Sequence, residues 1–264
     1  MKLSGNTILI TGGSSGIGLE LASQLLKLGN TVIITGRDQH KLDDARGRLP
    51  EIHALRSDVS DPEAIRQLFD TVIREFPKLN VLVNNAGIMR EINLQDTRSG
   101  PQGIGREIET NLTGPVRMVA TFLPHLKAQE NAAILNVSSG LAFVPLPIAP
   151  VYCATKAGMH SFTQSLRIQL KNTGIKVFEL APPLTKTSLF ATDFHAEDVR
   201  TVRMMDVRKM VGIALEGLKK DRLEIRPGPS NFLKLMSRLA PQFILNRLSK
   251  SVDTMLLRDA ARQP

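Results

Sequence analysis

The chain of 264 residues is 42% apolar and 22% charged, the balance of a globular protein with one large domain. Cys153 is the only cysteine, so an internal disulfide is excluded and a cysteine-based zinc site is not expected. No apolar run approaches the roughly 18 residues of a membrane span, and glycines closely follow the short N-terminal stretch Ile8–Ile10. We therefore expect no membrane span, no signal peptide and a cytoplasmic protein.

The formal net charge of +9 is concentrated near the C-terminus. Residues 200–264 carry 14 lysines and arginines against 6 acidic residues, whereas the preceding residues are almost balanced. Such a segment could bind nucleic acid or an anionic membrane surface, or it could simply form a solvated face. Because the chain has no tryptophan and one tyrosine, few rings are available for stacking on bases, and we expect no nucleic-acid binding.

Short apolar runs rich in β-branched residues alternate with helix-length segments along the chain. Each run is typical of a buried parallel strand. The expected strands, in chain order, are Thr7–Ile10, Thr31–Thr35, a short His53–Leu55, Leu79–Val83, Ala133–Val137, Lys176–Leu180 and a last short Arg222–Arg226.

Helical patterns occupy the segments between these strands. In Asp61–Phe76, apolar residues recur at helical spacing after an aspartate suited to the N-cap and a proline at the first helical position. The other expected helices are Gly16–Leu28, Thr113–Gln129, Val151–Asn172 and Asp206–Leu218. This alternation predicts right-handed βαβ units and an α/β fold, a Rossmann-type doubly wound parallel sheet flanked by helices.

The last residues, 229–264, have a different character. Apolar residues recur there at helical spacing with basic residues between them, and Pro229 and Pro241 divide the segment. We expect a basic, helical C-terminal extension that packs on the body or on a partner subunit. A peripheral membrane contact or a substrate lid is the alternative.

A glycine-rich turn, Thr11–Gly18 (T-G-G-S-S-G-I-G), joins the first expected strand to the first helix. Glycines permit a tight turn and the close approach of a pyrophosphate, and a helix N-terminus favours its negative charge. Residues 1–228 are therefore expected to form one dinucleotide-binding catalytic domain. The residues expected at the phosphates are Gly12, Ser14, Ser15, Gly16, Ile17 and Gly18.

The same turn also matches the hydrolase elbow G-x-S-x-G, at Gly12–Gly16. That elbow normally follows several strands, and acid and histidine partners come later. Here the turn follows the first strand and no later histidine has an evident triad partner, so the hydrolase interpretation is not favoured.

Tyr152 and Lys156 are four residues apart and would share one face of a helix. A free tyrosine is a poor base at neutral pH because its pKa is about 10. A nearby ammonium group favours the phenolate, which suits a tyrosine acting as an acid/base. An ordinary helical Tyr/Lys pair is the alternative.

Four motifs in register resemble the short-chain dehydrogenase/reductases. They are T-G-G-S-S-G-I-G, Asn84–Gly87 (N-N-A-G), Ser138-Ser139 and Tyr152–Lys156 (Y-C-A-T-K). The resemblance covers about residues 5–200. Within the family the chain looks closest to the DltE-like bacterial oxidoreductases, on the features Asn111, Ser139–Phe143 and Ala181–Pro183.

The resemblance implies a catalytic role for each matching residue. Tyr152 matches the general acid/base, and Lys156 matches the residue that lowers the tyrosine pKa and binds the nicotinamide ribose. Ser139 matches the hydroxyl that polarises the substrate carbonyl, with Ser138 as the alternative serine. Asn111 matches the residue that holds a water in a proton relay to Lys156.

Further cofactor contacts are implied along the strand ends. Asp58 and Val59 match the pair beside the adenine ring. The turn under the cofactor and the nicotinamide-carboxamide stretch are matched by Asn85, Ala86 and Gly87, and by Pro182, Thr185 and Thr187. The family usually has Pro-Gly where this chain has Pro182-Pro183, and a second proline, with no N–H and a fixed φ, predicts a locally different turn.

The end of the second strand predicts a preference for NADP(H) over NAD(H). The family's NAD-preferring members usually have a carboxylate where Gly36 stands, and Arg37 beside it can bind a 2′-phosphate. Asp38, an acid about 20 residues after the glycines, is the counter-argument. We interpret Asp38 as the N-cap of the next helix.

These features predict an NADP(H)-dependent oxidoreductase that transfers a hydride between nicotinamide and a carbonyl/alcohol substrate. The alternative is a catalytically weak NADP(H)-binding redox sensor or membrane-associated scaffold, against which the intact set Asn111, Ser139, Tyr152 and Lys156 argues. The five histidines show no metal-ligand spacing, so no metal is expected.

Apolar residues near the expected site predict an apolar substrate pocket, suited to a small ketone or aldehyde, although core or interface packing is an equal alternative. They are Leu141, Ala142, Phe143, Val144, Leu146 and Ile148 before the tyrosine, and Leu189, Phe190 and Phe194 in the loop after the sixth strand.

We also expect a homodimer. The family usually dimerises through the helices that correspond to Thr113–Gln129 and Val151–Asn172. Apolar residues on more than one face of a helix need a second covering surface; here they are Val116, Val119, Phe122 and Leu123, and Met159, Phe162, Leu166 and Leu170. The basic extension replaces the segment that often builds a tetramer interface.

Overall fold

The computed structural model describes residues 1–95, 105–187 and 204–260. Its strands form one parallel sheet in the order β3-β2-β1-β4-β5-β6-β7, which confirms the expected fold class. The strands are β1 Thr7–Thr11, β2 Thr31–Gly36, β3 His53–Arg56, β4 Leu79–Asn84, β5 Ala133–Val137, β6 Lys176–Leu180 and β7 Glu224–Ile225. The first six agree with the sequence analysis to within one residue, and the last is shorter than expected.

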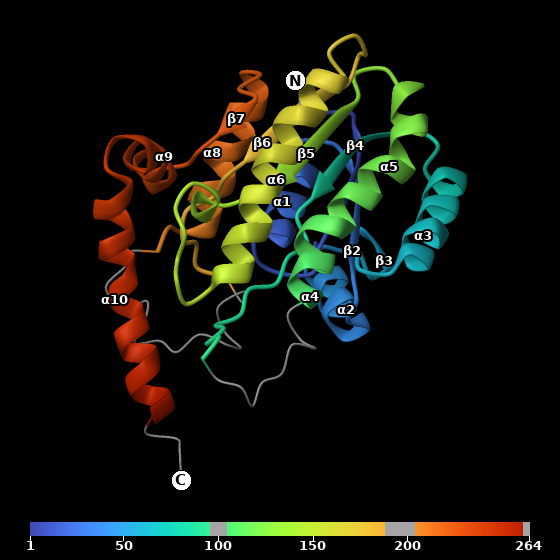
Figure 1. Cartoon of the computed structure of the whole chain (residues 1–264). Coiled ribbons are helices and arrows are strands. Elements are labelled where there is room, and N and C mark those ends of the chain that lie inside the picture. Colours follow the sequence, from blue (N-terminus) through green and yellow to red (C-terminus); the bar gives the residue numbers. More distant parts are fainter. Residues whose placement is uncertain (96–104, 188–203, 261–264) are drawn as a thin grey trace.

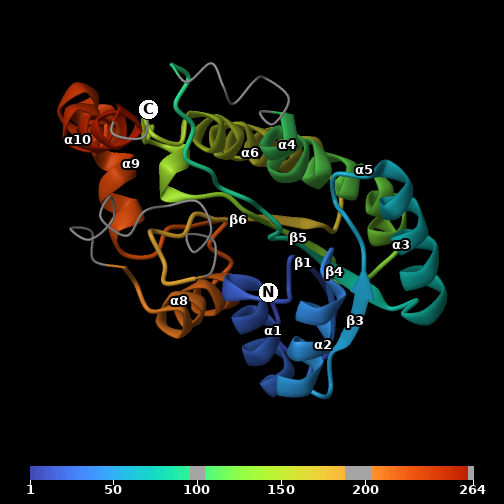
Figure 2. The ribbon, with the colours of Figure 1, turned by 90° about the horizontal axis from the view of Figure 1, so that it is seen from below.

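Helices cover both faces of the sheet. Figures 1 and 2 show α3, α5 and α6 on one face and α1, α2 and α8 on the other. The helices and helical turns are α1 Gly16–Lys27, α2 Gln39–Arg48, α3 Pro62–Glu75, α4 Gly105–Ile108, the π-turn η3 Glu109–Thr113, α5 Gly114–Lys127, the 3-10 turn η4 Gly140–Ala142, α6 Pro150–Gln169, α8 Val207–Lys219, α9 Pro229–Leu239 and α10 Pro241–Ala260.

Aspartate N-caps set the starts of three of these helices. The carboxylate of Asp61 accepts a hydrogen bond from the backbone N–H of Glu63 at 2.9 Å, with Pro62 at the first helical position as expected. Asp38 caps α2 and Asp206 caps α8 in the same way. The interpretation of Asp38 as a cap is therefore confirmed.

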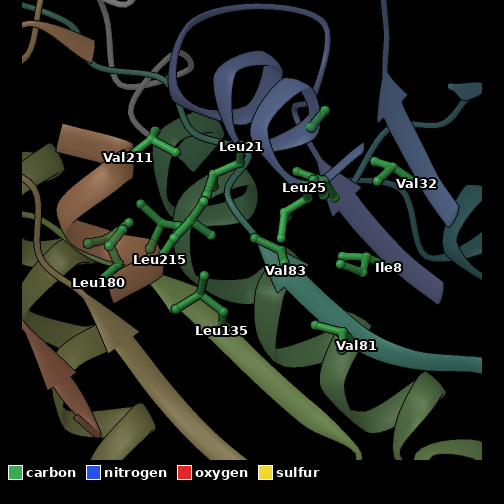
Figure 3. Close-up of a cluster of buried hydrophobic side chains, with 14 of the residues drawn as sticks. Ile8, Leu21, Leu25, Val32, Val81, Val83, Leu135, Leu180, Val211 and Leu215 are labelled. Carbon is green, nitrogen blue, oxygen red and sulfur yellow. The ribbon is translucent and has the colours of Figure 1, made fainter. Parts of the chain in front are cut away.

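The alternation of side chains along each strand divides the core into two halves. Ile8 and Ile10 of β1 pack toward α1 and α8, whereas Leu9 between them packs toward α3 and α5. Because both faces are covered, the strands are apolar along almost their whole length. Figure 3 shows the first half, where the labelled side chains are Ile8, Leu21, Leu25, Val32, Val81, Val83, Leu135, Leu180, Val211 and Leu215.

The strand order reverses at β1. After β1 the chain moves outward to β2 and β3, and it then returns to place β4 on the other side of β1. The helices that follow β1 and β4 therefore lie on opposite faces of the sheet, and a ligand crevice is expected at the carboxyl ends of these strands. The glycine-rich turn after β1 and the N-N-A-G segment after β4 both lie at this edge.

The C-terminal extension contacts the body through both of its helices. Ser230 and Leu233 of α9 pack on Gly140, and the Lys234 ammonium forms an ion pair with Glu224. Ile244 and Met255 of α10 are buried. Both helices also carry exposed apolar side chains, which are Phe232, Leu235 and Leu239 on α9 and Phe243 and Leu257 on α10. None of the helices in the described ranges has the length and apolar character to cross a membrane.

Close backbone packing at Gly18 yields a prediction about stability. A Cβ on Gly18 would lie 2.4 Å from the carbonyl oxygen of Gly12. We expect Gly18→Ala to lower the free energy of unfolding by about 1–3 kcal/mol, because backbone in a packed core must move to accept the methyl group. Chemical denaturation followed by circular dichroism measures this change.

Gly47→Ala is the matched control. Gly47 lies inside α2, and a Cβ there would meet nothing within 4 Å. The same substitution is expected to stabilise the protein by about 0.5–1 kcal/mol through helix propensity. Equal effects at the two glycines would contradict the packing argument.

Candidate active site

The glycine-rich turn is held against the end of β4 by one threonine and one asparagine. The Thr11 hydroxyl accepts hydrogen bonds from the N–H groups of Asn85 and Ala86 at 3.0 and 3.1 Å. The Asn85 side-chain amide donates to the carbonyl groups of Thr11 and Gly12 at 2.9 and 3.0 Å. Asn85, expected from the resemblance to lie under a cofactor, therefore also joins the two loops of the crevice.

The turn is shaped to receive an anionic group. Gly12 and Gly16 have φ of +64° and +54°, which favours glycine, and a Cβ on Gly12 would lie 2.8 Å from the Ala86 Cα. Helix α1 follows directly and has no acidic residue in its first turn. Its N-terminal N–H groups are thus available without local negative charge, which fits a pyrophosphate.

A second part of the crevice lies at the end of β2. A Cβ on Gly36 would lie 3.2 Å from the Ser14 hydroxyl, so a longer side chain at position 36 would crowd the glycine-rich turn. Next to Gly36, the half-exposed Arg37 guanidinium lies 3.8 Å from the Asp58 carboxylate. Asp58 also accepts hydrogen bonds from the N–H and hydroxyl of Ser60, so its position is fixed.

The segment after β6 closes the other side of the crevice. The Pro182 carbonyl accepts a hydrogen bond from the Gly140 N–H at 2.8 Å, and the buried Thr185 hydroxyl donates to the Pro183 carbonyl at 2.8 Å. Thr187 lies beside Gly16, where a Cβ would come within 3.2 Å of its side chain. The two-proline turn therefore runs back toward the glycine-rich turn.

Tyr152 and Lys156 lie one turn apart on α6, with the ammonium nitrogen 5.7 Å from the centre of the tyrosine ring. The Lys156 Nζ donates to the carbonyl of Val137, the last residue of β5, at 2.9 Å. Ser139 follows β5, and its hydroxyl accepts a hydrogen bond from the Leu141 N–H at 3.1 Å. Strand β5 and helix α6 together bring these side chains to one place.

Asn111 lies in the π-turn η3, a local widening that often occurs at functional sites. Its side-chain oxygen accepts from the Ile88 N–H and its NH₂ donates to the Ile88 carbonyl, both at 2.8 Å. A Cβ on Gly87 would lie 3.4 Å from the Asn111 oxygen and 3.5 Å from the Lys156 Nζ. Because residue 87 is glycine, it places no side chain of its own near these two groups.

Burial dominates the acid–base properties of the pair on α6. It raises the pKa of Tyr152 above its ordinary value of 10, and a hydrogen bond with Ser139 opposes this only partly. It lowers the pKa of Lys156 from 10.5 to about 8. The resemblance implied that Lys156 lowers the tyrosine pKa; in the protein alone, desolvation of the phenolate is the largest influence on this pKa. Burial therefore favours the protonated form of Tyr152.

The two adjacent serines have different environments. The Ser138 hydroxyl donates to the buried Glu179 carboxylate at 2.5 Å, and the other oxygen of Glu179 bonds the His160 ring nitrogen at 2.7 Å. Ser138 is thereby engaged in the core, whereas Ser139 bonds Tyr152. This arrangement favours Ser139 over the alternative serine.

Sequence reasoning missed Glu107 of α4, which is fully buried near Tyr152 and raises its pKa. Its carboxylate accepts from the backbone N–H of Arg90 at 3.0 Å and pairs with the Arg90 guanidinium at 3.3 Å. The sequence signal was a glutamate four residues before Asn111, which puts both on one helical face.

The structure also brings together three possible metal ligands that are far apart in the sequence. Side-chain atoms of His160, Glu179 and Glu224 lie within 4.8 Å of one another. Glu224 already pairs with Lys234 and Arg226. Because these cations neutralise its charge, the cluster is an ion-pair network between the body and α9.

Only some of the apolar residues expected around the substrate lie beside Tyr152. Leu141 and Leu146 pack beside Tyr152 with Met89. Val144 and Ile148 are buried, and Phe143 packs its ring edge-on against His160. Leu189, Phe190 and Phe194 lie outside the described residues.

The lowered pKa of Lys156 predicts a pH-dependent stability. Between about pH 8 and 10.5 the unfolded chain holds more protons at this residue than the folded protein, so the free energy of unfolding rises with pH. Below pH 8 the folded protein bears the full cost of burying the ammonium. We expect Lys156→Met to be more stable than wild type at pH 7 by about 1–3 kcal/mol, with the difference shrinking toward pH 10.

Denaturant unfolding of both proteins at several pH values measures this difference. Lys171→Met, at an exposed lysine just after α6, serves as the control and should follow wild type at every pH. A stability difference that stays constant from pH 7 to 10 would exclude the buried ammonium as its source.

Three comparisons bear on identity. Residues 6–198 match the family model described as short chain dehydrogenase. The chain is 48% identical over 228 residues to the uncharacterized oxidoreductase DltE of Bacillus subtilis (strain 168), covering 85% of this chain and 89% of that protein.

The fold is shared with solved structures. A short chain dehydrogenase from Burkholderia cenocepacia J2315 in complex with NADP superposes with a TM-score of 0.79 at 25% identity, over 94% of this chain and 99% of that one. A short chain dehydrogenase/reductase from Burkholderia phymatum in complex with NAD gives 0.82 at 22% identity, over 94% and 96%. With the family model spanning most of its length and a DltE relative at 48% identity, this chain belongs to the short-chain dehydrogenase family and is similar to the DltE-like oxidoreductases.

Proposed function

We propose that this protein is an NADP(H)-dependent oxidoreductase that interconverts a carbonyl compound and its alcohol. The observation that carries the proposal is the clustering of Asn111, Ser139, Tyr152 and Lys156 next to the N-N-A-G turn that packs on the glycine-rich turn. Substrates in this family are small molecules, and the apolar side chains beside Tyr152 favour a small apolar ketone or aldehyde.

A bound nicotinamide dinucleotide would supply the hydride for reduction and take it up in oxidation. It would lie along the crevice, its pyrophosphate at the turn Gly12–Gly18 and its adenine near Asp58 and Val59. Asn85–Gly87 would lie under it, with Pro182, Thr185 and Thr187 near the carboxamide. Glycines that leave room for backbone contact and an α1 terminus without acidic residues fit such a group.

The protein's own residues would handle the proton and the oxygen. Tyr152, kept protonated by burial, donates its proton to the carbonyl oxygen during reduction, and Ser139 donates a hydrogen bond to the same oxygen. Lys156, with a pKa of about 8, keeps a positive charge near the phenolate at neutral pH. Asn111, which like Lys156 borders Gly87, is suited to hold a water for proton resupply.

The redox sensor or scaffold is less well supported. A protein that only bound a dinucleotide would not need a buried lysine one turn from a buried tyrosine, since burying the Lys156 ammonium costs stability. A site arranged around these two side chains favours turnover.

Replacing Tyr152 tests this function. We expect Tyr152→Phe to lower kcat by about 10²–10⁴-fold, because only the proton-donating hydroxyl is removed. Cofactor affinity should stay within about twofold of wild type. The assay follows NADPH absorbance across a panel of ketones, aldehydes and alcohols, with cofactor affinity measured by fluorescence.

Cys153→Ser is the control, because Cys153 packs beside Tyr152 on the same helix and its substitution leaves the hydroxyl in place. A Tyr152→Phe enzyme with more than about a tenth of wild-type kcat would remove Tyr152 from the acid/base role. Faster turnover of charged sugars or amino acids than of apolar ketones would overturn the substrate class.

Preference for NADPH is proposed from the end of β2. The half-exposed Arg37 guanidinium is adjacent to Gly36, and Asp38 is engaged in capping α2 rather than placed for a ribose. The NADP complex of the Burkholderia cenocepacia relative is compatible with this preference.

We expect Arg37→Ala to weaken NADPH binding by about 10–100-fold through loss of a charge-assisted hydrogen bond, and to leave NADH binding nearly unchanged. Fluorescence titration with both cofactors measures the two affinities. Arg46→Ala, at an exposed arginine on α2, should change neither. Equal wild-type affinities for NADPH and NADH would contradict the proposed preference.

A homodimer through α5 and α6 is also proposed. Most of the apolar residues expected to need a partner are in fact buried in the subunit's own core, including Val119, Phe122, Met159 and Leu166. The remaining support on α6 is Ile168, which is 66% exposed, together with the oligomers usual in this family.

Light scattering coupled to size exclusion should give twice the subunit mass of 29.0 kDa. Ile168→Glu should shift the protein toward the monomer, because a buried unpaired charge is unfavourable at an interface. Leu28→Glu, at an exposed leucine after α1, should not. A monomeric wild type, or a dimer unaffected by Ile168→Glu, would contradict the proposed interface.

A further inference from the structure

The segment after β4, residues 88–93, connects the catalytic residues to the C-terminal helix. At its start, both backbone groups of Ile88 bond the Asn111 side chain, and the buried Met89 packs against Tyr152. Farther along, the Ile92 N–H donates to the Ile148 carbonyl at 2.9 Å, just before α6 begins. Any displacement of this segment would therefore reach both Asn111 and Tyr152.

Charged side chains hold the same segment from two sides. Arg90 pairs with the buried Glu107 of α4. Glu91, the next residue, forms an ion pair with Arg258 of α10, and the Asn93 amide donates to the Asp259 carboxylate at 2.8 Å. In Figure 2, α10 and this loop lie at the same end of the molecule.

We propose that Arg258 of α10 is a positioning residue for the active site. Through Glu91 it holds residues 88–93 against Asn111 and Tyr152, so that the C-terminal extension completes the substrate side of the catalytic centre. This inference rests on the proposed oxidoreductase function.

Burial makes this ion pair more than a surface contact. The side chains of Glu91 and Arg258 are 11% and 20% exposed, so both groups have lost most of their water. Removing one partner leaves the other charged and largely desolvated, which is far less favourable than breaking an exposed pair. The segment would then have to move to hydrate Glu91.

The ion pair lies away from most of the residues proposed to hold the cofactor, which are on the loops after β1, β2, β3 and β6. Asn85–Gly87 do precede residues 88–93 directly, but Asn85 and Ala86 are held by hydrogen bonds to Thr11 and Gly12 and not by α10. Loss of the ion pair should therefore change the use of substrate more than the affinity for cofactor.

A charge swap tests the proposal in the full-length protein. We expect Arg258→Glu and Glu91→Arg each to lower kcat/KM for the best carbonyl substrate by about tenfold or more, with the NADPH dissociation constant within about twofold. The double variant Glu91→Arg/Arg258→Glu restores the pair with reversed charges and should recover kcat/KM to within about threefold of wild type.

Arg247→Glu is the matched control, because it makes the same charge change on an exposed part of α10 and should behave as wild type. Hydrogen exchange supplies a readout independent of activity. The amides of residues 88–93 should exchange faster in Arg258→Glu than in Arg247→Glu, and regain protection in the double variant. Equal behaviour of Arg258→Glu and Arg247→Glu, or a double variant no better than the single ones, would overturn the proposal.

The proposed oxidoreductase function and the positioning role of Arg258 are tested by different measurements. A wild-type protein that neither binds NADPH nor turns over any carbonyl substrate would remove the proposed function. The hydrogen-exchange comparison would still report whether Arg258 orders residues 88–93.

Discussion

The close packing of the β1 and β4 loops is the constraint on which the rest of the site depends. Gly12 approaches Ala86 so closely that a single Cβ would not fit, and the Asn85 amide bonds the carbonyls on both sides of the junction. This contact forms where the strand order reverses, so it defines one wall of the crevice. This contact fixes the place where α1 begins and the direction in which the chain leaves β4 toward residues 88–93.

Burial of Tyr152 and Lys156, the proposed catalytic pair, is the second constraint, and it shifts their two pKa values in opposite directions. It favours the neutral forms of both Tyr152 and Lys156, raising one pKa and lowering the other. The same environment strengthens each hydrogen bond made there, including the bond from Lys156 to the Val137 carbonyl. The buried ammonium of Lys156 reduces the stability of the fold at neutral pH, and the large two-sided core compensates for this cost.

The C-terminal extension contacts the site from outside. Helix α9 rests on η4, the turn that follows Ser139, and its Lys234 joins the network of Glu224 and His160. Helix α10 pairs with the segment that packs on Tyr152. Through these contacts an element outside the sheet touches the turn that follows Ser139 and the segment that packs on Tyr152.

Local patterns predicted nearly all of the sheet and its helices, because strand and helix periodicities are properties of short stretches. The strands were predicted to within one residue except β7, which has only two residues and is defined by pairing with β6. Asp38 and Asp61 could be interpreted as caps because capping depends on neighbours within three residues. Four motifs in register were enough to indicate the family and the candidate site residues.

The tertiary structure alone decided what each side chain meets. The sequence could not show that Ser138 bonds Glu179, that Glu107 is buried near Tyr152, or that burial is the largest influence on the tyrosine pKa. It could not distinguish core from interface for Phe122 or Met159, nor connect Glu91 with Arg258, 167 residues away. Chain composition and motif spacing determine which elements form and which chemistry is available, whereas burial, charge pairing and desolvation depend on contacts between residues distant in the sequence.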